Sequence, residues 1–143
     1  MAFPIGATAS LALQVAVLVL LILALLLKNR KKYRQHGIAM ASAVVLHLIT
    51  VVAVMGPSFR ISFSSPGIAF FEAPVIITLI HVASGLVAVT LGIWLVASWH
   101  FKTDLKNCFS RKKIMRPTFV LWVASALLGI LMYIVFYAST LFS

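Results

Sequence analysis

Hydrophobic side chains fill four long windows of the chain, and charged side chains are confined to the segments between them. No Asp, Glu, Lys or Arg occurs within residues 1–27, 37–59, 73–101 or 117–143. Each window can hold the roughly 20 apolar residues that carry one helix across about 30 Å of hydrocarbon. The pattern therefore predicts an all-α integral membrane protein. We expect one transmembrane domain over residues 1–143, a four-transmembrane-helix antiparallel bundle with helices at about 7–27, 35–55, 74–99 and 117–137.

Prolines indicate where three of these helices begin or end. Gly56-Pro57 follows the second window, and proline lacks an N–H group, so we expect the second helix to end near residue 55. Pro74 and Pro117 are expected in the first turns of the third and fourth helices. Beyond Ser10, the first helix has one polar side chain, Gln14, so we expect this helix on the lipid-exposed side of the bundle.

The connecting segments predict smaller features at the membrane surface. We expect residues 58–73 to form a loop whose aromatic side chains suit the headgroup region. Apolar residues at helical spacing within 101–109, ending near Cys108, predict a short interfacial helix.

Composition and charge agree with this assignment. The chain is 63% hydrophobic and 10% charged, with a mean hydropathy of +1.14, whereas soluble domains have about 25% charged residues. Eleven of the twelve Lys and Arg residues lie within 28–36 and 100–116. Because such residues favour the cytoplasmic side, we expect a cell-membrane protein with both basic loops cytoplasmic and both termini outside. We attribute the net charge of +10 to contact with the anionic inner leaflet of the lipid bilayer rather than to nucleic acid.

Histidines within the helices are the main candidates for chemistry, because ionisable groups are costly in lipid. His47 lies ten residues before Pro57 and His81 lies seven after Pro74, so their depths differ by about 4–5 Å at 1.5 Å per residue. Two imidazoles at matched depth on facing helices can ligate a b-type haem. Gly85 and Gly92 share the His81 face and would form a trough for the porphyrin. The sequence thus predicts one haem b on His47 and His81.

Other interpretations of the histidines remain open. Each could instead form hydrogen bonds with hydroxyl or carbonyl groups across a helix interface. His36 and His100 lie at the inner boundary, and a second haem or metal site there is disfavoured because His100 is turned about 100° from the His81 face. A mononuclear metal site is disfavoured because no carboxylate or thiolate lies at membrane depth.

Short motifs in the last three helices suggest a family. His36-Gly37-Ile38-Ala39-Met40, Ile80-His81-Val82-Ala83 and Arg111-Lys112-Lys113-Ile114 precede Thr118, Trp122, Gly129 and Tyr133. Over residues 31–137 this pattern resembles the small multi-helix membrane family of unknown function that includes the haem-copper oxidase assembly factor CtaM, although Arg111 stands where that family usually has a histidine. The segment Ile80–Gly85 is also similar to a haem-ligating helix of cytochrome b561-type four-helix proteins. Both resemblances imply a respiratory context.

Two functional hypotheses follow, and they belong to different classes of protein. The first is a membrane b-type haem protein that carries single electrons, with a quinone as a candidate partner. The alternative is a cofactor-free assembly factor or accessory subunit of a haem-copper oxidase or another larger membrane complex. Hydrolytic and phosphoryl-transfer enzymes are disfavoured, because the chain contains no Ser/His/Asp set, phosphate-binding glycine loop or paired carboxylates.

Overall fold

A computed structural model describes residues 5–64, 67, 72–99 and 110–137. Within these residues all regular structure is helical. The elements are α1 (Ile5–Asn29), α2 (Tyr33–Thr50), the π-helical turn η1 (Val51–Met55), α3 (Gly56–Phe63), α4 (Ala73–Trp99) and α6 (Lys112–Tyr137). Four helices, one of them running from α2 through η1 into α3, are long and apolar enough to cross a membrane.

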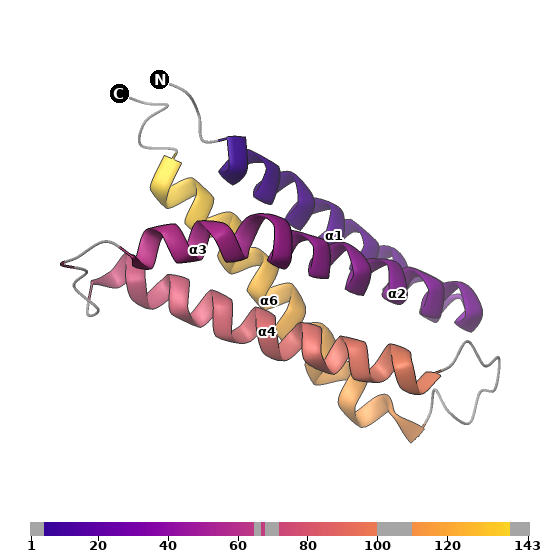
Figure 1. The fold of residues 1–143 in the computed structure, drawn as a ribbon. Coiled ribbons are helices and arrows are strands. Elements are labelled where there is room, and N and C mark those ends of the chain that lie inside the picture. The colour runs from indigo at the N-terminus through magenta and orange to yellow at the C-terminus, as the bar shows by residue number, and fades with distance from the viewer. Residues whose placement is uncertain (1–4, 65–66, 68–71, 100–109, 138–143) are drawn as a thin grey trace.

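The four long helices alternate in direction and form a closed ring (Figure 1). α1 packs against α2, α2 against α4, α4 against α6, and α6 against α1. The start of α1 and the end of α6 lie at the same end of the bundle. Large apolar side chains on all four helices point outward and are exposed, as expected where the surrounding solvent is lipid.

The second helix is longer than the sequence predicted. The expected end at Gly56-Pro57 is wrong, because η1 joins α2 to α3 and the helix continues to Phe63. The Gly56 N–H donates to the Val51 carbonyl, a π-type bond five residues back. After this wide turn α3 begins as a new helical segment with Pro57 in its first turn, where a missing N–H is tolerated. The expected loop at 58–73 is therefore helical as far as Phe63.

The fourth helix begins before its proline. α6 starts at Lys112, so Pro117 lies inside the helix rather than at its first position. At this position proline removes the hydrogen bond to the Lys113 carbonyl and its ring crowds that carbonyl, which is the usual cost of a proline beyond the first turn. The expected interfacial helix at 101–109 lies outside the described residues.

The α1–α2 connection is short, so most of the basic segment 28–36 is helical. The Lys31 N–H donates to the Lys28 carbonyl and the Lys32 N–H to the Leu27 carbonyl. Lys31 has φ 60°, so these bonds close a helix end of the Schellman type with lysine in the usual glycine position.

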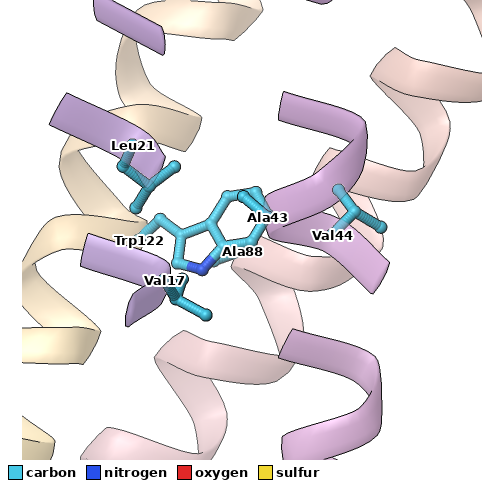
Figure 2. Packing of buried hydrophobic residues seen from close by; sticks show 6 residues of the cluster. All are labelled: Val17, Leu21, Ala43, Val44, Ala88 and Trp122. Carbon is cyan, nitrogen blue, oxygen red and sulfur yellow. The ribbon is translucent and has the colours of Figure 1, made fainter. Parts of the chain in front are cut away.

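The core lies at mid-bundle around Trp122 of α6, which is fully buried (Figure 2). Side chains of α1, α2 and α4 surround its indole: Val17, Leu21, Ala43, Val44 and Ala88. The first helix was expected on the lipid-exposed side of the bundle; α1 does expose large apolar side chains, but it also contributes two of these core residues and buries Gln14. An apolar helix that packs with small and branched residues can belong to a membrane bundle as fully as one with polar motifs.

Candidate functional site

A cavity of about 840 Å³ opens within the half of the bundle that contains α3. All four long helices line it, from Gly6 and Tyr137 at one end to the level of His47, Gly85 and Ser125. The walls are mainly apolar and aromatic, whereas the deep end holds imidazole, amide and hydroxyl groups. Binding sites for small molecules commonly combine these features at volumes of about 300–1,000 Å³.

His81 lies at the deep end with one ring nitrogen held by α6. Its Nδ1 is 2.9 Å from the Ser125 carbonyl oxygen, and the side chain is 8% exposed. A carbonyl only accepts hydrogen bonds, so Nδ1 carries the proton and donates. The Nε2 atom of the neutral ring then keeps a free lone pair. Histidines that bind metals are commonly oriented by this kind of Nδ1–H to carbonyl bond.

His47 lies at the same level, but its hydrogen bond has the opposite sense. The Trp122 indole Nε1–H donates to His47 Nδ1 at 2.8 Å, and the two rings meet edge to face with centroids 5.5 Å apart. An indole N–H only donates, so Nδ1 must be the unprotonated nitrogen. In the neutral ring the proton therefore lies on Nε2, which is 3.9 Å from where a Cβ on Gly85 would stand.

Gln14 of α1 completes the polar deep end. Its Nε2 donates to Ser10 Oγ at 3.2 Å, whereas its Oε1 is buried and has no hydrogen-bond donor. A second hollow of about 10 Å³ is lined by Gln14 together with both histidines, Met55 and Ser125. This volume approaches that of a single water molecule.

Glycines let these side chains approach the neighbouring backbones. A Cβ on Gly129 would meet Gln14 Oε1 and would stand 2.9 Å from His81 Cε1. A Cβ on Gly85 would stand 3.1 Å from Ser125 Oγ. Gly129 and Gly85 therefore admit polar side chains between helices, as small residues do in membrane bundles.

The structure brings three of the four main predicted site residues together. His47, His81 and Gly85 line one cavity. Gly92 lies elsewhere, under the Trp122 ring, where a Cβ would be 2.7 Å from Trp122 Cζ3. The expected porphyrin trough at Gly92 is thus filled by an indole.

Of the other two candidate histidines the structure describes only His36, which stands apart from this site. His36 Nδ1 is 2.7 Å from the Ala24 carbonyl, so the ring links α2 to α1. His100 lies outside the described residues. Within the described ranges, no group of three or more His, Cys, Asp or Glu residues could hold a metal ion.

Sequence reasoning missed Gln14 and Met55 as parts of the site, and it named Trp122 only as part of the motif in the fourth helix. One signal was available for Gln14, because an amide in an otherwise apolar stretch needs a polar surrounding. Met55 reaches the cavity through the π-helical turn, which no sequence pattern indicated.

No family model, curated protein or solved structure matches this chain.

Proposed function

We propose that this chain is a membrane b-type haem protein that carries single electrons in a respiratory context. The observation that carries the proposal is His81, whose Nδ1 is fixed on the Ser125 carbonyl while its Nε2 lone pair is free beside a cavity of about 840 Å³. This is the orientation that an axial haem ligand requires. A bound haem supplies one-electron oxidation and reduction.

The surroundings of His81 fit such a group. The cavity walls are predominantly apolar, with aromatic side chains from Phe59, Phe63 and Tyr133 among them. An apolar pocket holds a porphyrin by burial of its faces, while one oriented imidazole fixes the metal. Gly85, one turn after His81, keeps that side of the cavity free of side-chain bulk.

We further propose that the cavity faces the outer side of the cell membrane. Of the ten cations on described residues, nine lie around the α1–α2 connection or the start of α6, at the other end of the bundle, and Lys and Arg favour the cytoplasmic side. A redox partner that reaches the cavity would then approach from the outer leaflet or the outer aqueous phase, and a quinone dissolved in the bilayer is one candidate.

The experiment is a visible spectrum of the detergent-purified protein after haem-replete expression. We expect a Soret band and a dithionite-reduced α-band, both lost in His81→Ala because no other residue replaces its oriented Nε2. His36→Ala is the matched control and should keep both bands, because His36 bonds to α1 away from the cavity.

A colourless wild-type protein would overturn the haem proposal. If that colourless protein also co-purified with a larger membrane complex in mild detergent, the assembly-factor or accessory-subunit hypothesis would replace it.

A further inference from the structure

We infer that His47 is a hydrogen-bond donor inside the site and not a second iron ligand, so that the site takes a small exogenous molecule beside it. This inference rests on the proposed haem on His81. With a haem bound, His81 would be its single protein ligand, and the site would have room for a molecule of the size of water or a diatomic gas.

The first step is the proton of His47. Because the Trp122 N–H donates to Nδ1 at 2.8 Å, the neutral ring carries its proton on Nε2, the atom that would have to bind iron. Ligation through Nε2 would require either an imidazolate or a proton on Nδ1. The second arrangement would leave two N–H groups facing each other at that distance, with neither hydrogen bond made.

The second step is that Trp122 cannot easily withdraw. Its side chain is fully buried, and its benzo ring fills the gap above Gly92 within the cluster of buried core residues (Figure 2). A rotation that freed His47 Nδ1 would need to empty this gap and displace the surrounding core. Close packing in protein interiors opposes such a movement.

The third step is that a small hollow lies beside both imidazoles and offers space for a small molecule. It measures about 10 Å³ and is lined by Gln14, whose buried Oε1 has no donor. Gln14 is only 9% exposed, so this oxygen is an unpartnered acceptor within the site. A donor, His47 Nε2–H, and an acceptor, Gln14 Oε1, thus belong to side chains around a space near the size of one small polar molecule.

These three observations separate His47 from His81, although both lie at similar depth and burial. The Ser125 carbonyl prepares His81 to bind a metal, and the Trp122 indole prepares His47 to donate a hydrogen bond. Trp122 is therefore a positioning residue that acts through His47.

Carbon monoxide is the probe for an open position, and the C–O stretching frequency reports a nearby donor. We expect the dithionite-reduced wild-type protein to be high-spin and to bind carbon monoxide. His47→Leu should keep the haem bands and carbon monoxide binding while the C–O stretching frequency rises, because a positive donor is lost.

Trp122→Phe gives the sharper readout. Without the indole N–H, His47 can carry its proton on Nδ1 and bind iron through Nε2. We expect a change to a low-spin spectrum and a carbon monoxide association rate at least about tenfold slower. The double variant Trp122→Phe/His47→Leu should return to the high-spin spectrum, which a merely structural effect of Trp122 would not produce.

The possible results separate failure of this inference from failure of the proposed function. Absence of any haem band overturns both proposals. If the wild-type protein is low-spin and does not bind carbon monoxide, the haem proposal stands and the inference of an open position for a small molecule is wrong. If His47→Leu then gives a high-spin spectrum, His47 is the second ligand, whereas the same result from Met55→Leu alone assigns that role to Met55.

Discussion

Gly92→Ala tests whether Trp122 is locked in the position on which the site depends. A Cβ at residue 92 would lie 2.7 Å from Trp122 Cζ3 and 3.1 Å from Val44 Cγ2. Carbon atoms prefer about 3.5–4.0 Å, so the indole would need to move by roughly 1 Å. It is held on its other side by the 2.8 Å bond to His47, and it is not the end of a flexible chain.

The expected magnitude combines two opposing terms. Overpacking a filled core costs about 1–3 kcal/mol, and the locked ring places this site near the upper end. Replacing a helical glycine by alanine contributes about 1 kcal/mol in the stabilising direction. We therefore expect the free energy of unfolding to fall by about 2 kcal/mol, or roughly 30-fold in the unfolding equilibrium constant.

The assay is SDS titration of the protein in mixed micelles, followed by helical circular dichroism. Gly6→Ala is the matched control, because a Cβ there would meet nothing within 4 Å, and its stability should be unchanged or slightly higher. In Gly92→Ala/Trp122→Phe the smaller ring relieves the clash, so the double variant should be less destabilised than the sum of the single changes. A Gly92→Ala protein as stable as wild type would refute the account of a locked indole.

Two further predictions concern polar groups of α1 and α2. Gln14→Leu removes the buried unpartnered Oε1 and also the hydrogen bond from Nε2 to Ser10. These two effects oppose each other, so stability in the same titration, without added ligand, should change by less than about 1 kcal/mol. A larger decrease would mean that Oε1 already holds a donor. His36→Ala removes the 2.7 Å bond to the Ala24 carbonyl and should lower stability by about 1 kcal/mol, whereas no change would show that the α1–α2 contact does not depend on this ring.

Much of the fold could be predicted because the lipid environment leaves few alternatives. A charge-free window of more than 20 residues must satisfy its backbone internally, which requires a helix. The predicted spans 7–27 and 74–99 agree within two residues with α1 and α4. Pro57 misled the prediction because a π-helical turn changes which N–H the next turn needs, and that turn has no signature in the local sequence. The membrane orientation of the bundle stays a prediction.

The pairing of His47 with His81 could also be predicted, although the predicted end of the second helix was wrong. Counting from Pro57 and Pro74 placed His47 and His81 at similar depth, and the structure has both lining one cavity because α2 and α4 are antiparallel neighbours. The glycine stripe of α4 was a poorer guide. A glycine in a helix shows that another group packs closely against the backbone, but the sequence does not show which group. At Gly92 that group is the Trp122 ring rather than a cofactor.

The difference between the two histidines arises on a single face of α6. Trp122 and Ser125 are three residues apart and therefore lie side by side on that helix. One presents an indole N–H to His47 and the other a backbone carbonyl to His81. Because the first group can only donate and the second can only accept, one helix face fixes opposite tautomers on two imidazoles of similar burial. Any movement of α6 that weakened one bond would also disturb the other, so the unprotonated Nε2 of His81 and the Nε2–H of His47 are set together.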